Sequence, residues 1–168
     1  LQLTSAKPCR PYDAARNGIS VGEGAAFALL ERTDNPAPGS LLLLGTGESS
    51  DAYHMSSPHP EGLGAKMAMA AALRSAGLTA GDIDYINLHG TASAKNDEVE
   101  ARLVARHFGP KLHASSTKGW TAHTLGAAGI VEAAVCLLAL ETGLRPGTLN
   151  ARVLDAVCGP QVRLHTER

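Results

Sequence analysis

Two short segments of the sequence gather residues whose types and spacing could carry chemistry. In the first, residues 87–93 (NLHGTAS), an apolar run ends at His89, and Gly90 permits a turn with backbone angles closed to other residues. Ligands gather at the carboxyl ends of strands in open α/β sheets. Thr91 and Ser93 can present two hydroxyls along one side of an extended loop. A histidine that merely caps a strand explains His89 equally well.

The second segment, residues 115–129 (SSTKGWTAHTLGAAG), runs from the end of a predicted strand to the start of an apolar helix. Lys118 and His123 lie five residues apart on this connection. The helix N-terminus offers free N–H groups and positive potential. This segment is the second candidate site, and a packing motif with a surface lysine is the alternative interpretation.

Three acidic residues are candidates for supporting roles. Glu132 is the one charge in the apolar run of residues 130–140, and an unpaired buried carboxylate is costly. We therefore expect a cation or a water-filled site beside Glu132, and a plain structural salt bridge is as good an explanation as catalysis. Asp97 and Glu100 lie three residues apart on one predicted helix face, where ordinary helix-dipole acids also account for them.

The elements that must position these residues alternate along the chain. Helices are predicted where apolar or Ala-rich runs lack proline, strands where short apolar runs end at turn signals. The resulting order predicts an α/β fold, and the 168-residue length predicts one domain, residues 1–168. The helix at residues 130–140 is apolar all round except Glu132, so we expect it to be buried on every side. The predicted helices are residues 61–76, 97–108 (with a Glu98–Arg102 pair) and 130–140, and the predicted strands are residues 19–31, 41–44, 82–88, 112–116 and 162–164.

Composition and motif searches exclude several classes of function. A net charge of −1 does not favour nucleic acid as a partner, and the sequence shows neither an uninterrupted apolar run of ~18 residues nor a secretory leader, so no membrane span is expected. The histidines show no zinc spacing, so no metal site is expected. Cys9, Cys136 and Cys158 form no C-x-x-C motif, which favours reduced thiols and a cytoplasmic location.

Residues 82–91 and 116–132 resemble the two histidine motifs of the β-ketoacyl-acyl carrier protein synthases, the condensing enzymes of fatty-acid and polyketide synthesis. The resemblance implies a thiolase-like α/β fold, of which this chain would be the C-terminal half, with a mixed sheet and a buried central helix. It extends in order over nearly the whole chain, with supporting similarity at residues 10–13, 22–25 and 49–55.

The resemblance also implies roles for four residues in a decarboxylative condensation. His89 and His123 would donate hydrogen bonds to the thioester carbonyl of a malonyl unit. Carbon dioxide would leave, and the resulting enolate would attack an acyl group held on a cysteine. Fixed donors in a dry pocket stabilise the negative charge that grows on that oxygen. Lys118 would support the site electrostatically, and Glu132 would organise the network.

The same resemblance implies how the substrate is held. Thr91 and Ser93 would bind the phosphopantetheine arm of an acyl carrier protein, which delivers the malonyl and acyl thioesters. Asp97 and Glu100 would help hold the lysine and the loop. No permanently bound cofactor is implied, because phosphopantetheine arrives as a substrate arm. The protein would form a homodimer or pair with the other half of the fold.

The sequence also departs from the family. The family's nucleophilic cysteine belongs to an N-terminal half, and none of the three cysteines here has its context, so this chain alone is expected to be inactive. Glycine-rich final strands with a gating phenylalanine would follow Arg168. Ala94 and Ala122 replace a frequent proline and glycine, and the bulky Trp120 is expected to affect acyl-chain preference.

Two other functions compete with a condensing enzyme. A non-catalytic subunit, similar to a chain-length factor or binding a carrier protein, would share the fold without the reaction. Retention of both histidines and Lys118 argues against it. A thiolase or another acyltransferase of the superfamily is disfavoured by the two-histidine pattern. The apolar helix at residues 130–140 should pack against the other half of the fold, so the isolated chain would expose apolar surface, which predicts self-association, domain pairing or poor solubility.

Overall fold

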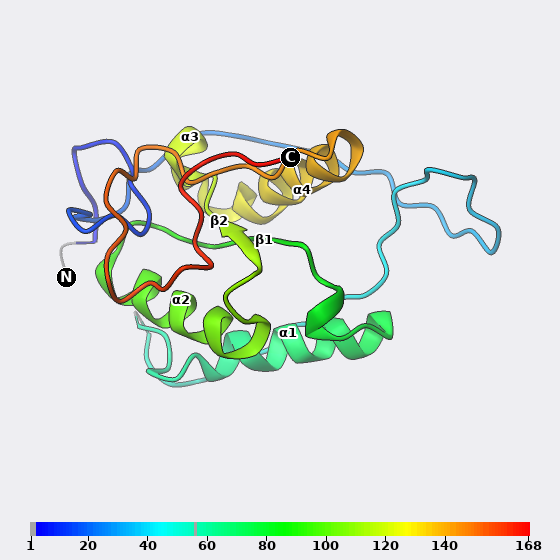
Figure 1. Cartoon of the computed structure of the whole chain (residues 1–168), viewed down its shortest axis with the longest axis horizontal. Helices are drawn as coiled ribbons and strands as arrows, with labels where there is room; N and C mark the ends of the chain where they lie inside the picture. The colour runs from blue at the N-terminus through cyan, green and yellow to red at the C-terminus, as the bar shows by residue number, and fades with distance from the viewer. Residues whose placement is uncertain (1–2, 56) are drawn as a thin grey trace.

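The structure of the chain is a computed structural model, and it describes residues 3–55 and 57–168. Figure 1 shows two helices, α1 and α2, below a small sheet and a third long helix, α4, above it. Within the described residues the elements, in chain order, are α1 (Leu63–Ala76), β1 (Tyr85–Asn87), α2 (Ala94–Phe108), β2 (His113–Ser115), α3 (Lys118–Thr121) and α4 (Ala128–Thr142), with the 3₁₀ turns η1 (Ala80–Asp82) and η2 (Leu125–Ala127).

The sheet confirms the predicted α/β class. β1 and β2 pair in parallel, with Tyr85 opposite His113 and Asn87 opposite Ser115, and α2 provides the crossover between them. Antiparallel pairing among the described residues is confined to isolated bridges, so the expected mixed sheet is not formed there. The parallel register brings the carboxyl ends of β1 and β2 together, which is where both candidate segments begin.

The helix predictions at residues 61–76 and 97–108 are confirmed, with small shifts at their ends. α1 ends at Gly77, whose left-handed backbone lets its amide donate to the Arg74 carbonyl. α2 begins three residues earlier than predicted, because Ser93 has the extended backbone of an N-cap residue. The Glu98–Arg102 pair also forms, with 2.8 Å between Oε1 and Nη1.

The core lies between α2, the sheet and two loop segments from the ends of the chain. Tyr12 comes from the N-terminal loop, and Cys158 and Val162 come from the C-terminal segment. Because these loops complete the core, they also cover the base of the loop that follows β1. The buried members of the cluster are Tyr12, Leu88, Ala101, Val104, Leu112, Ala114, Cys158 and Val162.

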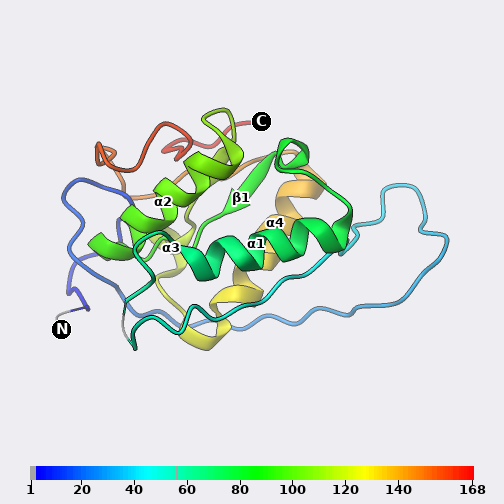
Figure 2. The same ribbon diagram turned by 90° about the horizontal axis from the view of Figure 1, so that it is seen from below.

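The strands predicted at residues 19–31 and 41–44 are wrong. Figures 1 and 2 show this region leaving the body of the chain and returning along α1. A Cβ added at Gly24 would lie 3.5 Å from Val131 Cγ2 of α4, and one added at Gly45, which directly follows residues 41–44, would lie 2.6 Å from the Ala72 carbonyl oxygen of α1. The later part of the first segment lies against α4 and the second segment lies against α1. Backbone pairing of residues 19–31 is confined to isolated bridges such as Val21–His123, so no continuous strand forms there.

The strand predicted at residues 162–164 is also wrong. Val162 makes one isolated bridge to Ala114 of β2, and the Arg163 amide donates to the Ala114 carbonyl at 2.8 Å. The Arg163 carbonyl instead accepts from the Thr148 amide at 3.0 Å. The segment leaves β2 after a single pair because its next acceptor is used by another loop.

α4 is a helix where predicted, but the expectation that it is buried on every side is wrong. Ala128 is its buried residue, whereas Leu138 and Leu140 are 56% and 67% exposed. Among the described residues, Leu125–Thr142 is a helical stretch long and apolar enough to cross a membrane, with 6% of it buried. The core helix of a soluble protein meets the same criteria of length and composition, and Glu132 of this helix is ion-paired.

Candidate functional site

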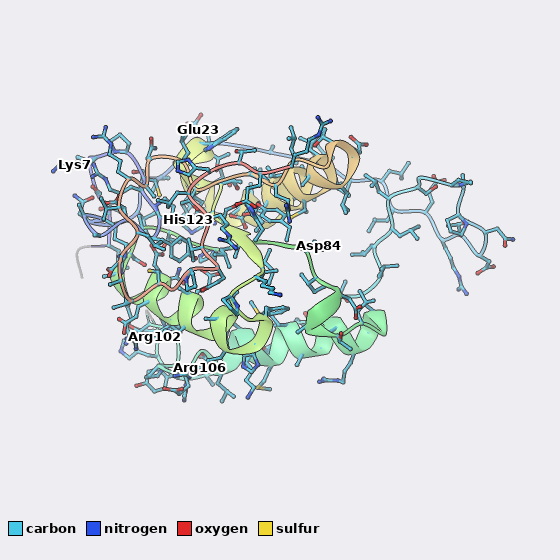
Figure 3. All side chains as sticks on the ribbon, in the orientation of Figure 1. Lys7, Glu23, Asp84, Arg102, Arg106 and His123 are labelled. Atoms are coloured by element: carbon cyan, nitrogen blue, oxygen red, sulfur yellow. The ribbon has the colours of Figure 1, made fainter. Side chains whose placement is uncertain are left out.

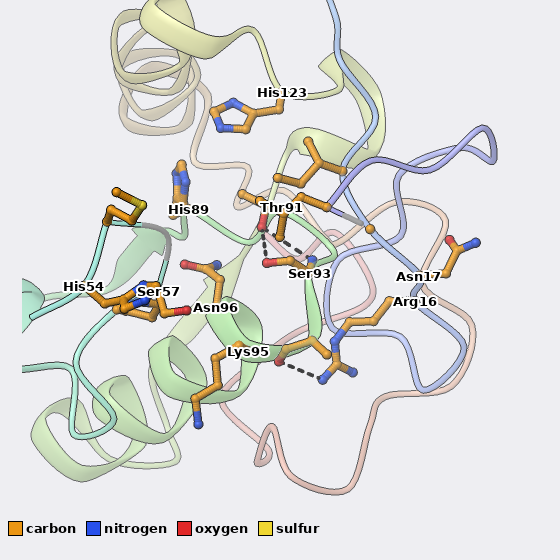
Figure 4. Close-up of a pocket in the computed structure, with 16 residues that line it drawn as sticks. Arg16, Asn17, His54, Ser57, His89, Thr91, Ser93, Lys95, Asn96 and His123 are labelled. Carbon is orange, nitrogen blue, oxygen red and sulfur yellow. Dashed lines mark hydrogen bonds between the residues drawn. The ribbon is translucent and has the colours of Figure 1, made fainter. Parts of the chain in front are cut away.

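The two predicted histidine segments meet in the structure. His89 follows β1, His123 follows α3, and their ring centroids lie 5.1 Å apart with the rings edge-to-face at 85°. Both line one cavity of about 580 Å³ (Figure 4). In Figure 3, His123 lies toward the middle of the fold, whereas Arg102 and Arg106 of α2 lie at its lower edge. The sequence predicted both segments, and the parallel sheet brings them together.

Lys118 joins three parts of the site. Its side chain is 1% exposed, and its Nζ donates to the His89 carbonyl oxygen at 2.6 Å and lies 3.3 Å from His89 Nδ1. The same Nζ forms an ion pair with Glu132 of α4. The expected partner of Glu132 is therefore Lys118, and the two candidate segments are connected through one ammonium group.

The hydrogen bonds assign the same tautomer to both histidines. An ammonium group can only donate, so His89 Nδ1 accepts from Lys118 Nζ. His123 Nδ1 accepts in the same way, from the Leu125 amide at 3.2 Å. In a neutral imidazole the proton then resides on the other nitrogen. Each ring therefore carries an Nε2–H that is free of these two contacts and can donate to a ligand.

The electrostatics of the site favour neutral histidines. Burial, reinforced by the positive charge of Lys118, holds the pKa of His89 below its usual value, and burial and Lys118 lower the pKa of His123 in the same direction. Burial raises the pKa of Glu132, although Lys118 acts against this. Both imidazoles are consequently neutral hydrogen-bond donors at neutral pH.

Glu100 and Asp97 fix the loop that carries His89. Glu100 Oε1 accepts from the His89 amide at 2.7 Å, and its Oε2 accepts from the Gly90 amide at 2.8 Å. Asp97 Oδ1 accepts from the Thr91 amide at 3.0 Å, and burial raises the pKa of Asp97 to about 6. These acids thus hold the loop directly. Lys118 is held by His89 and Glu132 instead.

The other histidine is positioned by a close approach of two backbones. Val21 bridges to His123, and the Gly22 amide donates to the His123 carbonyl at 3.1 Å. A Cβ added at Gly22 would lie 2.1 Å from the Thr121 carbonyl oxygen, so only glycine fits there. Gly22 and its neighbours therefore place His123.

Two predicted hydroxyls line the cavity beyond the histidines. Thr91 Oγ1 and Ser93 Oγ lie 2.9 Å apart and share a hydrogen bond. Asn96 reaches toward His89, whereas Lys95 points away from it (Figure 4). The lining of the cavity therefore extends from the two imidazoles to two hydroxyls and to the polar side chains of residues 95 and 96.

Two residues of the site were not among the predicted ones. Tyr12 donates through its backbone amide to Asp97 Oδ2 at 2.8 Å and through its hydroxyl to Glu100 Oε2 at 2.6 Å. Arg16 is paired with Asp97 and Asp155, at 3.6 Å and 2.6 Å. The similarity of residues 10–13 to the family was a signal for Tyr12. Nothing in the sequence pattern singled out Arg16.

None of the three thiols has the environment of a nucleophile. Burial raises the pKa of Cys9 and of Cys136, and it raises the pKa of Cys158 to about 12. A nucleophilic cysteine needs the opposite shift, because the thiolate is the reacting form.

In residues 3–55 and 57–168, no group of three or more His, Cys, Asp or Glu side chains could hold a metal ion.

Sequence comparisons relate the chain to known proteins. Residues 42–152 match the family model described as beta-ketoacyl synthase, C-terminal domain. The 3-oxoacyl-[acyl-carrier-protein] synthase 2 of Rhizobium meliloti (strain 1021) is 44% identical over 86% of this chain and 36% of its own length. Nodulation protein E of Rhizobium meliloti is 40% identical over 95% of this chain and 41% of its own length. The chain thus spans about two fifths of the length of these relatives.

Solved structures share the fold. The ishigamide ketosynthase/chain length factor matches with a TM-score of 0.90 and 32% identity, covering 99% of this chain and 42% of that chain. The ketosynthase ApeO in complex with its chain length factor ApeC, from Xenorhabdus doucetiae, matches with a TM-score of 0.86 and 38% identity, covering 99% and 41%. Both overlap residues of every element described above.

Proposed function

Because the chain belongs to the β-ketoacyl synthase family and matches its C-terminal domain, we propose that it supplies the two-histidine half of a condensing site. The reaction is the decarboxylative Claisen condensation of a malonyl thioester with an acyl thioester, in fatty-acid or polyketide synthesis. The α/β, thiolase-like fold is that of the ketosynthases it resembles. The observation that carries the proposal is the pair of neutral Nε2–H donors on facing imidazoles.

These donors suit the charge that decarboxylation creates. When the bond between the malonyl α-carbon and its carboxylate breaks, carbon dioxide leaves and the electron pair passes to the thioester oxygen as an enolate. His89 and His123 donate to that oxygen without themselves losing a proton. The enolate α-carbon then bonds to the carbonyl carbon of an acyl thioester on a cysteine, whose thiolate is the leaving group.

Lys118 and Glu132 act as supports in this proposal. The ammonium group of Lys118 disfavours a second proton on His89 Nδ1, which keeps that imidazole in the donor form. Glu132 balances the buried lysine charge from α4. Asp97 and Glu100 hold the loop on which His89 lies.

Substrates reach the site on an acyl carrier protein in this proposal. Thr91 and Ser93 line the cavity beyond His89 and bind the phosphopantetheine arm, which is part of the substrate rather than a resident cofactor. Residues 1–168 alone do not complete the condensation, because the thiols they contain have raised pKa values. Pairing with a second half of the fold or a second subunit supplies the nucleophile.

The three free cysteines support a cytoplasmic location.

A decarboxylation assay on the intact protein tests the proposal. Substituting His89→Ala or His123→Ala should lower the release of carbon dioxide from a malonyl thioester by ~10²-fold or more, because each removes one oxyanion donor. His107→Ala, on the exposed last turn of α2, is the matched control and should leave the rate unchanged. Full decarboxylation in both site variants would contradict the assignment.

A non-catalytic subunit is the second candidate function. The observation in its favour is that both solved structures reported above contain a chain length factor beside a ketosynthase. Such a subunit would keep the fold and show no decarboxylation even with His89, His123 and Lys118 intact. The same assay on the unsubstituted protein therefore separates the two functions.

A further inference from the structure

We propose that Tyr12 is a positioning residue for His89 and that its hydroxyl acts through Glu100. The inference rests on the proposed function of His89 as an oxyanion donor. Tyr12 lies 88 positions from Glu100 in the sequence, in a loop with no helix or strand, yet it is fully buried beneath the loop that follows β1.

The contact runs through one carboxylate. Glu100 Oε2 accepts two hydrogen bonds, from the Tyr12 hydroxyl at 2.6 Å and from the Gly90 amide at 2.8 Å. The other oxygen of the same group accepts from the His89 amide at 2.7 Å. The hydroxyl therefore holds the plane of a carboxylate that fixes two consecutive amides, one of them belonging to His89. Hydrogen bonds to an ionised carboxylate are among the stronger ones in proteins.

The ring of Tyr12 restricts the same loop from below. Gly90 has a φ of 33°, and a Cβ added there would lie 2.7 Å from Tyr12 Cε2 and 2.5 Å from Ser116 Cβ. The Tyr12 backbone amide also donates to Asp97, the residue that accepts from the Thr91 amide. Three successive amides, of residues 89 to 91, are thus held by two carboxylates that each bind Tyr12.

Displacement of this loop would lower the rate of decarboxylation. The His89 carbonyl accepts from Lys118 Nζ, so a shift of the loop moves both the imidazole and the contact that sets its tautomer. Misplacement of a reacting group by 1 Å can lower the reaction rate by ~10²-fold. Loss of the hydroxyl alone, with the ring retained, should produce a smaller loss, on the order of 10-fold.

A double-mutant cycle on the intact protein tests this role. Tyr12→Phe removes the hydroxyl and keeps the packing, so the kcat for malonyl thioester decarboxylation should fall about 10-fold while KM changes less than twofold. Glu100→Gln should lower kcat as well. Because the hydroxyl acts through Glu100, Tyr12→Phe should have almost no further effect in the Glu100→Gln background.

Tyr85→Phe is the matched control. It removes a partly buried hydroxyl that bonds to Ser115 between β1 and β2, away from Glu100, and should leave kcat unchanged. A Tyr12→Phe variant with the unsubstituted kcat, or losses that multiply in the double variant, would overturn the role of Tyr12. If His89→Ala also keeps full activity, the proposed function fails, whereas activity lost in His89→Ala and retained in Tyr12→Phe refutes only the inference about Tyr12.

Discussion

Lys118 contacts His89 twice, through the backbone carbonyl oxygen at 2.6 Å and through ring Nδ1 at 3.3 Å. The first contact fixes where the residue lies, and the second fixes which ring nitrogen carries the proton. One buried ammonium group therefore determines both the place and the donor character of the imidazole. Its charge is balanced by Glu132, which belongs to a different helix.

Breaking the Lys118–Glu132 pair should destabilise the protein more than removing it entirely. Lys118→Met leaves a carboxylate that is 17% exposed without its cation, which should lower the free energy of unfolding by ~3 kcal/mol. Lys118→Met/Glu132→Gln should recover much of that loss, because neither buried charge remains. Urea unfolding of both variants measures the difference, and equal stabilities would contradict the coupling.

The two histidines should make stability and activity fall on acidification. Burial and Lys118 lower both pKa values, so between those values and about pH 6.5 the unfolded chain binds more protons than the folded one. The free energy of unfolding therefore decreases as the pH falls through this window. Activity decreases at its lower end, where a protonated Nδ1 can no longer accept from its donor.

This histidine contribution can be isolated with a double variant. Asp97, whose pKa is raised to about 6, contributes the opposite slope, since the folded state then binds more protons than the unfolded one. Urea unfolding at pH 7 and pH 5.5 should show a smaller loss of stability for His89→Gln/His123→Gln than for the unsubstituted protein. If kcat/KM already begins to fall on acidification above pH 6.5, that result would contradict the lowered pKa values of the histidines.

The two hydroxyls of the cavity should affect binding rather than chemistry. Thr91→Val/Ser93→Ala removes two neutral hydrogen-bonding groups, at about 1 kcal/mol each, so KM for a malonyl group carried on acyl carrier protein should rise roughly 10- to 30-fold. The kcat should change less than twofold. A short malonyl thioester without the phosphopantetheine arm is the control substrate, and an equal rise in its KM would argue against arm binding.

The exposed leucines of α4 should make residues 1–168 self-associate when produced alone. Leu138 and Leu140 are more than half exposed on different sides of the helix, and exposed apolar surface drives association. Leu138→Glu/Leu140→Glu should reduce the sedimentation coefficient toward that of a monomer. Arg74→Glu, at the end of α1, adds a similar negative charge elsewhere and should have no such effect. A monomeric unsubstituted chain would refute the prediction.

The helices could be predicted because their signals are local. Gly77 ends α1, and the Glu98–Arg102 pair lies within α2 itself. The strands at residues 19–31 and 41–44 could not be predicted reliably, because an extended segment becomes a strand only beside a partner that the local sequence does not identify. Burial of α4 failed for the same reason, since composition predicts an apolar helix and not what covers it.

The residues of the site could likewise be predicted from the sequence only in part. Residue types and spacing singled out the segments of His89 and His123, and the cost of burying a charge predicted a partner for Glu132. The parallel register of β1 and β2 brings the His89 loop beside Lys118, because it puts two distant strand ends together. Tyr12 and Arg16 reach the site from a loop far away in sequence, and no periodicity reports such a contact.

The attachment of Tyr12 to Glu100 also bears on the order of folding. α1 and α2 close contacts within a few residues, whereas the His89 loop is fixed only when a segment 88 positions away has docked. Closing so long a loop carries an entropic cost that local helices do not pay. We therefore expect the helices to form early and His89 to reach its final place among the last steps, once the segment around Tyr12 has docked.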